Sequence, residues 1–254
     1  MALKTVDYDG RQHTVYAAGR AMPEDTKANW MRAFAEQLPA RRPLSLIDLG
    51  SGIGRLTPAL AETFGGPVHG VEPSAKMREV AEAAGPHAGV EYLEGEAARI
   101  PLDDASADAV LMFLSFHHVP DRAAAAKEIA RVLKPGGKVM IVSAFSKGTA
   151  GGSWWLQFFP RAGEIERAMF PALEATLAQF AAAGLTHHEL VQVPLRFWDS
   201  AAQAAGQLRL RPYSTFEHLT EAEIEEGFRR LDALVAAQTS PQPIMGKSDL
   251  LVLS

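Results

Sequence analysis

The chain has 254 residues, which is long enough to bury a substantial core and to form one large α/β domain. Apolar residues make up 47% and charged residues 22%, the balance of an ordinary globular protein, and the formal net charge of −5 argues against broad binding to nucleic acid or anionic membranes. There is no cysteine, which excludes disulfides, thiolate catalysis and cysteine metal sites. Residues 1–10 are too polar for a signal peptide and no run is apolar enough to span a bilayer, so we expect a cytoplasmic location.

Residues 1–42 are polar and mixed, without a strand signal. Within them, residues 24–38 carry Trp30, Met31, Phe34 and Leu38 at helical spacing. This period predicts one amphipathic helix.

Residues 44–55, L-S-L-I-D-L-G-S-G-I-G-R, combine a short apolar run with three glycines, Gly50, Gly52 and Gly54. The apolar run predicts a buried parallel strand, and residues 56–64 predict the helix that follows. Glycine allows a sharp turn and a close approach of the backbone to a ligand. Strand, glycine loop and helix together indicate the first half of a nucleotide-binding βαβ unit.

A second predicted strand, residues 67–71, ends in Glu72, about 20 residues after the loop. A carboxylate there can accept hydrogen bonds from a ribose diol and would repel a 2′-phosphate. The alternative, an exposed acid that only ends a strand, is disfavoured by this spacing.

The central block continues to alternate strand and helix, which predicts a parallel sheet. We expect a helix over residues 74–84 with Ser74 as its N-cap, strands over 90–93, 107–114 and 138–144, and a helix over 122–133 that P-G-G ends. Right-handed crossovers then place the strand ends carrying Gly50, Glu72, Gly95 and Phe113 along one edge of the sheet, where ligands of such folds bind.

The pattern changes after residue 146. A glycine-rich turn and four aromatic residues occupy 147–163, and residues 165–183 predict one helix. Strands are expected over 187–197 and 249–253, and residues 200–238 are mainly helical with R-L-R-P-Y-S-T-F-E-H as an interruption. The chain contains no repeats or low-complexity tracts.

The glycines follow G-x-G-x-G with Asp48 two residues ahead, and this run resembles motif I of the class I S-adenosylmethionine-dependent methyltransferases. V-H-G-V-E-P-S resembles their motif II. The runs Y-L-E-G-E-A-A-R-I-P-L, D-A-V-L-M-F-L-S-F-H-H-V and R-V-L-K-P-G-G-K-V resemble, in order, later motifs of the small-molecule (UbiE-like, methyltransferase type 11) branch.

The resemblance implies a Rossmann-like class I methyltransferase fold of the α/β class. This fold has a seven-stranded, mostly parallel sheet with helices on both faces and, here, a helical and aromatic cap. Residues 1–254 would form a single domain: 1–42 a segment that covers the cofactor, 43–146 the cofactor-binding core, and 147–254 the substrate side with a cap at about 199–240.

The same resemblance implies S-adenosylmethionine as cofactor and S-adenosylhomocysteine as product. Glu72 would hold the ribose and Arg20 would pair with the cofactor's carboxylate, although Arg20 as a solvated side chain and Tyr16 as a packing residue is an equal alternative. Met77, Phe113 and Leu114 also have an ordinary core interpretation. The full set of expected cofactor-binding residues is Tyr16, Arg20, Asp48, Gly50, Ser51, Gly52, Gly54, Glu72, Pro73, Met77, Glu96, Ala97, Phe113 and Leu114.

His117 and His118 are the candidate general bases, because they follow the fourth predicted strand directly into the site edge. Imidazole titrates near neutral pH and accepts protons from phenols, hydroxyls or amines. A structural role for each histidine is the alternative, and it is slightly favoured. His187 and His188 are expected on the surface.

Aromatic residues of the cap form the candidate acceptor pocket, with Trp154, Trp155, Phe158, Tyr213 and His218 as the expected substrate-binding residues. Further members of the set are Phe159, Phe197, Trp198 and Phe216. Packing of the cap on the domain is the alternative. Arg209 and Arg211 would meet an acidic acceptor or, more simply, water.

These patterns favour a methyltransferase that transfers the methyl group of S-adenosylmethionine to O, N or C of a small molecule, mainly by positioning. One alternative is a protein that binds this cofactor without methylating, as a partner subunit or rearrangement catalyst. A weaker one is an NAD-dependent oxidoreductase. We expect a small-molecule acceptor, no nucleic acid, no membrane, no metal, and a monomer or homodimer.

Overall fold

The computed structural model describes residues 8–145 and 152–254, and its centre is one mixed sheet. The strand order is β3-β2-β1-β4-β5-β7-β6. The strands are β1 (Leu44–Leu49), β2 (Gly65–Glu72), β3 (Val90–Glu94), β4 (Ala107–Phe113), β5 (Leu133–Ser143), β6 (His188–Trp198) and β7 (Ile244–Leu253). Strands β1 to β5 pair in parallel, and β7 runs antiparallel to both β5 and β6. This confirms the predicted seven-stranded, mostly parallel sheet.

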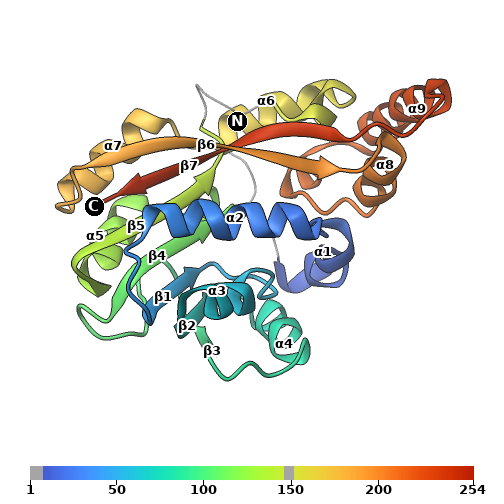
Figure 1. Cartoon of the computed structure of the whole chain (residues 1–254). Helices are drawn as coiled ribbons and strands as arrows, with labels where there is room; N and C mark the ends of the chain where they lie inside the picture. The colour runs from blue at the N-terminus through green and yellow to red at the C-terminus, as the bar shows by residue number, and fades with distance from the viewer. Residues whose placement is uncertain (1–7, 146–151) are drawn as a thin grey trace.

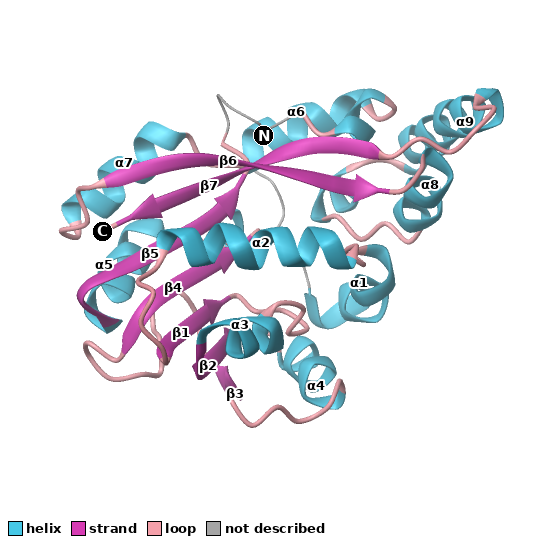
Figure 2. Ribbon diagram, viewed as in Figure 1, coloured by secondary structure: helices cyan, strands magenta, loops and turns pink. Residues whose placement is uncertain are grey.

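Helices lie on both faces of this sheet (Figures 1 and 2). They are α1 (His13–Gly19), α2 (Glu24–Gln37), α3 (Thr57–Phe64), α4 (Ala75–Ala83), α5 (Arg122–Val132), α6 (Pro160–Met169), α7 (Leu173–Ala182), α8 (Ala201–Arg209) and α9 (Glu221–Ala237). Local signals set several of their starts, because Ser74, Asp121, Ser200 and Thr220 each accept a hydrogen bond from a backbone N–H of the first turn.

The two faces of the sheet bury separate hydrophobic cores. In β1, Leu44 and Leu46 face the core of α2 and α3, whereas Ile47 and Leu49 face the core of α5 and α7. Strand β7 divides in the same way, with Leu250 and Val252 on one face and Leu251 and Leu253 on the other. Strands covered on both faces must be apolar nearly throughout, which is why the sequence shows continuous apolar runs here.

A third hydrophobic cluster forms the cap at the far ends of β6 and β7 (Figure 2). Trp155 is 1% exposed and stacks on Phe216 with ring centroids 5.2 Å apart. Phe159 packs edge-on against Phe216 and Phe228, at 5.4 and 5.2 Å. These contacts join α9, residues 214–218 and residues 155–159 into one aromatic unit.

Two predicted elements differ from the structure. The single helix predicted over residues 165–183 is wrong: Phe170 is extended, and α6 and α7 are separate helices on either side of it. Pro171 explains the break, because it lacks an N–H and disfavours helical geometry in the residue before it. Strand β5 also begins at Leu133 rather than Lys138, with a register shift before regular pairing with β4 begins at Lys138.

The carboxyl ends of β1, β2 and β4 meet at one edge, as predicted. The N–H of Gly50 donates to the carbonyl of Val71 at 2.7 Å, and Ser115 Oγ donates to the carbonyl of Leu49 at 2.8 Å. The loops that leave these three strands are therefore held side by side. The predicted boundary between residues 146 and 147, and residues 1–7 of the N-terminal segment, lie outside the described residues.

The cap offers a matched pair of glycine substitutions. A Cβ at Gly227 in α9 would lie 2.1 Å from the Phe159 ring, whereas a Cβ at Gly206 in α8 would meet nothing within 4 Å. We expect Gly227→Ala to lower the free energy of unfolding by about 1–3 kcal/mol through overpacking. Gly206→Ala should raise it by about 0.4–1 kcal/mol through helix propensity. Urea unfolding monitored by tryptophan fluorescence measures both, and equal effects would contradict this packing of the cap.

Candidate active site

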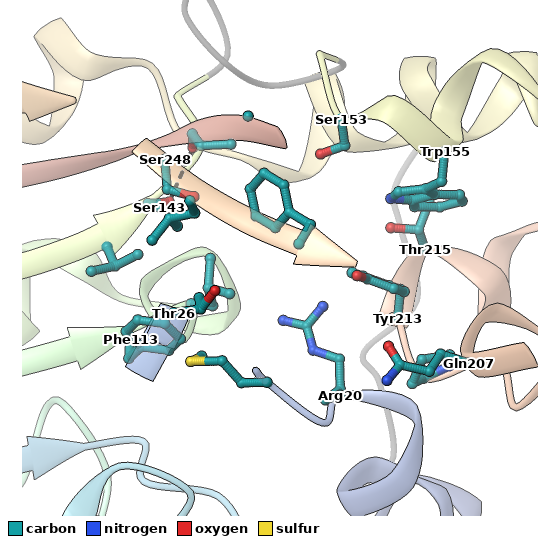
Figure 3. Close-up of a pocket in the computed structure, with 18 of the residues that line it drawn as sticks. Arg20, Thr26, Phe113, Ser143, Ser153, Trp155, Gln207, Tyr213, Thr215 and Ser248 are labelled. Atoms are coloured by element: carbon teal, nitrogen blue, oxygen red, sulfur yellow. Dashed lines mark hydrogen bonds between the residues drawn. The ribbon is translucent and has the colours of Figure 1, made fainter. Parts of the chain in front are cut away.

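Two cavities meet at the carboxyl edge of the sheet. The glycine-loop cavity, about 940 Å³, is bordered by Gly50, Gly52 and Glu72. The cap cavity, about 480 Å³, is bordered by Trp154, Trp155 and Tyr213. Figure 3 shows Trp155 and Tyr213 on one side of this cavity. The residues that line both cavities are Tyr8, Tyr16, Phe113, Leu114, His117, His118 and Met169. The site is thus a pair of chambers with a common wall.

The Glu72 carboxylate organises the glycine-loop cavity. It is 7% exposed, and its two oxygens accept hydrogen bonds from the backbone N–H groups of Gly52 and Ser74, each at 2.9 Å. Burial raises the pKa of the Glu72 carboxyl, while these two hydrogen bonds oppose the rise. A carboxylate has about four acceptor positions, so two donors leave capacity for a ligand's hydroxyl groups.

The three glycines of the loop all have positive φ, but their surroundings differ. A Cβ at Gly50 would lie 2.6 Å from Ser115 Cβ, and one at Gly54 would lie 2.0 Å from the Tyr92 hydroxyl. A Cβ at Gly52, by contrast, would meet nothing within 4 Å. Gly50 and Gly52 line the cavity, and Gly52 is the position where its backbone is open to a ligand.

Asp48 and Ser51 do not line either cavity. Asp48 is 2% exposed and accepts a hydrogen bond of 2.7 Å from Thr57 Oγ1. Burial raises the pKa of its carboxyl to about 6. Asp48 therefore lies beneath the loop and binds Thr57, the first residue of α3.

Four other expected cofactor-binding residues do border the glycine-loop cavity: Pro73, Met77, Glu96 and Ala97. They lie at the end of β2, in α4 and in the turn after β3. Met77 is 1% exposed, so it is also part of the packing beneath the cavity.

The end of β4 and the residues that follow it form most of the common wall of the two cavities. Phe113 ends the strand and packs edge-on against Trp30, with centroids 5.2 Å apart. Leu114 follows with φ +56°, a left-handed conformation that costs a non-glycine residue free energy. This turn sends the chain directly to His117 and His118, whose rings lie 4.0 Å apart.

Both histidines are neutral at physiological pH. Burial lowers the pKa of His118 to about 4 and lowers the pKa of His117 well below its ordinary value, with nearby cations adding to both effects. His118 Nε2 is 2.7 Å from the Tyr8 hydroxyl, and His117 packs on Phe170 with centroids 4.3 Å apart. His117 Nδ1 is buried without a hydrogen-bond partner among the described residues. Both side chains therefore present uncharged imidazole to the site.

Tyr16 borders both cavities, but Arg20 borders only the cap cavity. Figure 3 shows the Arg20 guanidinium group directed into this cavity and facing Tyr213. It lies 4.2 Å from the Tyr213 ring centroid and 5.8 Å from that of Tyr16. The alternative of a solvated Arg20 on a loose segment does not describe this position.

The expected acceptor residues are only partly brought together. Trp154, Trp155 and Tyr213 line the cap cavity, with Trp155 stacked 5.1 Å from Tyr213. Phe158 lines neither cavity, because it is 7% exposed and packs edge-on against Trp154 at 5.0 Å. His218 borders the glycine-loop cavity instead of the cap cavity.

The two arginines of the cap segment form ion pairs outside the cavities. Arg209 forms an ion pair of 2.5 Å with Asp232, and Arg211 forms one of 2.7 Å with Glu221. Neither lines a cavity, and their side chains are 47% and 32% exposed, so of the two expectations contact with water fits their position and contact with an acceptor does not. His187 and His188 are exposed, as predicted.

Three residues of the site were missed from the sequence: Tyr8, Arg55 and Glu166. Tyr8 borders both cavities and carries no local signal, because its partner His118 is 110 positions away. Arg55 borders the cap cavity directly after Gly54, and this adjacency was the available sequence signal. Glu166 borders the same cavity from α6.

The described part of the chain holds no cluster of three or more histidine, aspartate or glutamate side chains arranged for a metal ion. Within the same residues, no helix has the length and apolarity needed to cross a bilayer.

The fold is the class I methyltransferase fold. A putative methyltransferase from an antibiotic biosynthesis pathway of Anabaena variabilis superposes with a TM-score of 0.77 at 21% identity, covering 93% of this chain and 99% of that one. Residues 47–141 match the family Methyltransf_11, methyltransferase domain. Over residues 47–141 the chain is therefore similar to the methyltransferase domains of this family.

Curated proteins that are similar in sequence are also named methyltransferases. An uncharacterized methyltransferase of Mycobacterium tuberculosis is 42% identical over 127 residues, which cover 50% of this chain and 48% of the relative. The ubiquinone/menaquinone biosynthesis C-methyltransferase UbiE of Rubrivivax gelatinosus is 33% identical over 130 residues, 51% of this chain and 49% of the relative. The chain spans about half the length of the curated relatives it matches.

The low pKa of His118 predicts a stability that depends on pH. The unfolded imidazole, with a pKa of about 6.5, binds its proton before the folded one does, so stability is lost as pH falls from about 6.5 towards 4. We expect the His118→Asn variant to lose this contribution, which is about 2–3 kcal/mol between pH 7 and pH 4. Urea unfolding of both proteins across this range measures the difference. The same pH slope in both proteins would contradict the buried, neutral His118.

Proposed function

We propose that this chain transfers the methyl group of S-adenosylmethionine to a small-molecule acceptor. The observation that carries this proposal is the pair of cavities with a common wall at Phe113, Leu114, His117 and His118. One cavity has the carboxylate and glycine backbone that suit a nucleoside, and the other is an aromatic chamber of a size typical for a small molecule.

In this proposal the glycine-loop cavity holds the cofactor. Glu72 accepts hydrogen bonds from the ribose hydroxyls, and the open backbone at Gly52 lies against the amino-acid part. Met77, Glu96 and Ala97 surround the adenine, and Tyr16 and Arg20 close the site towards the cofactor's carboxylate. Asp48 and Ser51 act from outside the cavity by supporting the loop.

The common wall is where the two ligands would meet. When bound, S-adenosylmethionine supplies a methyl group on a positively charged sulfur, which a nucleophile attacks in line. The residues of the wall hold the acceptor at this point, and the enclosing aromatics Trp154, Trp155 and Tyr213 exclude water. Positioning of this kind is a sufficient source of rate for a displacement that needs no covalent intermediate.

His118 is the side chain best placed to accept a proton from the acceptor. It is neutral at physiological pH, borders both cavities and is oriented by the Tyr8 hydroxyl at 2.7 Å. His117 also lines both cavities, and its ring packs against His118 and Phe170 and so helps to fix the His118 ring. We further propose one catalytic domain over residues 1–254, in which 1–42 cover the cofactor, 43–146 bind it, and 147–254, with the cap at 199–240, enclose the acceptor.

Glu72 gives a direct test of cofactor binding. We expect Glu72→Ala to weaken binding of S-adenosylhomocysteine by roughly 10- to 100-fold, because hydrogen bonds to a charged group are lost. Isothermal titration calorimetry measures this change. Glu79→Ala is the control, because it removes an exposed carboxylate of α4 that pairs with Lys76 and lines neither cavity. Unchanged binding in Glu72→Ala, with its fold intact by circular dichroism, would refute the proposed cofactor site.

The transfer itself is tested with methyl-labelled S-adenosylmethionine. Purified protein is incubated with the labelled cofactor and a fractionated extract of the source cells, and mass spectrometry sizes the labelled products. We expect label in a small molecule, and a reduced rate in His118→Asn. Label only in protein or nucleic acid would overturn the acceptor class. No label from a protein that binds S-adenosylhomocysteine would identify a cofactor-binding protein that does not methylate.

A further inference from the structure

The cap cavity contains two arginines without an acidic partner. Arg20 and Arg55 both line this cavity and not the glycine-loop cavity. Among residues 8–145 and 152–254, neither forms an ion pair with a carboxylate, whereas Arg196 on the same cavity pairs with Asp25 and Asp199, each at 2.8 Å. Enclosed cations are normally paired, so two unpaired guanidinium groups in one cavity need an explanation.

The two arginines are held by neutral groups. Arg55 Nη1 donates a hydrogen bond of 2.5 Å to the carbonyl of Arg20, and its guanidinium group lies 5.4 Å from the Phe113 ring centroid. Arg20 faces Tyr213, and its Nε is buried without a hydrogen-bond partner (Figure 3). The two positive charges are close enough that Arg20 lowers the pKa of Arg55, although burial is the larger cause. An arginine nevertheless stays protonated at neutral pH.

The other titratable groups of this cavity leave an excess of positive charge. Glu166 is 6% exposed and supplies one carboxylate on the side of Tyr213, whose pKa it raises. Lys247 adds a cation at the exposed edge, and His117 and His118 are neutral. Burial raises the pKa of Tyr8 and of Tyr213, so these phenols also stay neutral and can donate hydrogen bonds.

The cofactor does not remove this excess. S-adenosylmethionine carries one carboxylate but also an ammonium and a sulfonium group, so its net charge is positive. Its carboxylate would satisfy one guanidinium group, which we have placed at Arg20. Arg55, on the Phe113 side of the cap cavity, then still forms no ion pair with a carboxylate of the described residues; the buried Asp48 raises its pKa from outside the cavity but is already bonded to Thr57.

We propose that the acceptor is an apolar or aromatic molecule that carries a carboxylate, and that Arg55 binds this carboxylate in the cap cavity. The inference rests on the proposed function, because it assigns the cap cavity to the acceptor. A guanidinium group matches a carboxylate with two parallel N–H donors, and the walls of Trp154, Trp155 and Phe113 suit the apolar remainder. A carboxylate near Arg55 would also offset the repulsion between the two arginines.

The same carboxylate chemistry has two sources, the acceptor and the cofactor, and calorimetry separates them. Protein saturated with S-adenosylhomocysteine is titrated with a panel of aromatic and alicyclic carboxylic acids, each beside its primary amide. We expect acids that fit the cavity to bind roughly tenfold more tightly than their amides. In Arg55→Gln this preference should disappear, while binding of S-adenosylhomocysteine stays within about twofold. Arg209→Gln is the control, because it removes an equal charge that already pairs with Asp232 outside the cavity.

The outcomes are distinct. An acid preference that Arg55→Gln removes and Arg209→Gln retains supports the proposal. The proposal is overturned if no acid binds better than its amide, or if Arg55→Gln keeps the preference. It is also overturned if Arg55→Gln weakens S-adenosylhomocysteine tenfold or more, which would assign this arginine to the cofactor's carboxylate. Failure of the wild-type protein to bind S-adenosylhomocysteine would instead refute the proposed function. Circular dichroism confirms that each variant is folded.

Discussion

A single buried carboxylate connects the parts of this site. Glu72, at the end of β2, accepts hydrogen bonds from Gly52 in the glycine loop and from Ser74 at the start of α4. Ser74 Oγ in turn donates to Asp9 Oδ1 at 2.6 Å, which ties residues 8–12 of the N-terminal segment to the same point. The loop that approaches the ligand, the acid that recognises it and the segment that covers it are therefore fixed relative to one another.

This connection explains how the N-terminal segment reaches the common wall. Asp9 is anchored at α4, so the neighbouring Tyr8 is held where its hydroxyl meets His118, 110 positions later. On the other side, the strained turn at Leu114 brings the histidines to the same place. Strain of this kind persists only where the surroundings determine it, and here it lies between the two cavities.

Elements with strong local signals were predictable from the sequence. Strands β1 and β4 have the apolar runs that two helix layers require, and Gly54 and Ser74 mark the turns that follow β1 and β2. The carboxylate of Glu72 was predictable from spacing alone, and its two backbone donors follow from the close approach of the loops.

Features that depend on distant pairing were not predictable. Pro171 separates α6 from α7, and only the structure shows that the break places Phe170 against His117. Phe158 and His218 read as pocket residues because they are aromatic and near the cap, yet neither lines the cap cavity. In the sequence, Arg55 is only the residue that follows the last glycine of the motif. Its place in the cap cavity could not be predicted, because residues 154–170 and 195–216 form much of that cavity.

The position of β7 has a consequence for the order in which the protein is built. The parallel strands β1 to β5 end at Ser143, but among the described strands β6 pairs with β7 alone, and β7 is also the strand that joins β6 to β5. During synthesis, β6 therefore has its strand partner only after residues 244–253 have been made. Leu250 and Val252 also belong to the core under α2 and α3, and Leu251 and Leu253 belong to the opposite core, so both cores of the parallel half stay incomplete until this late strand enters between β5 and β6.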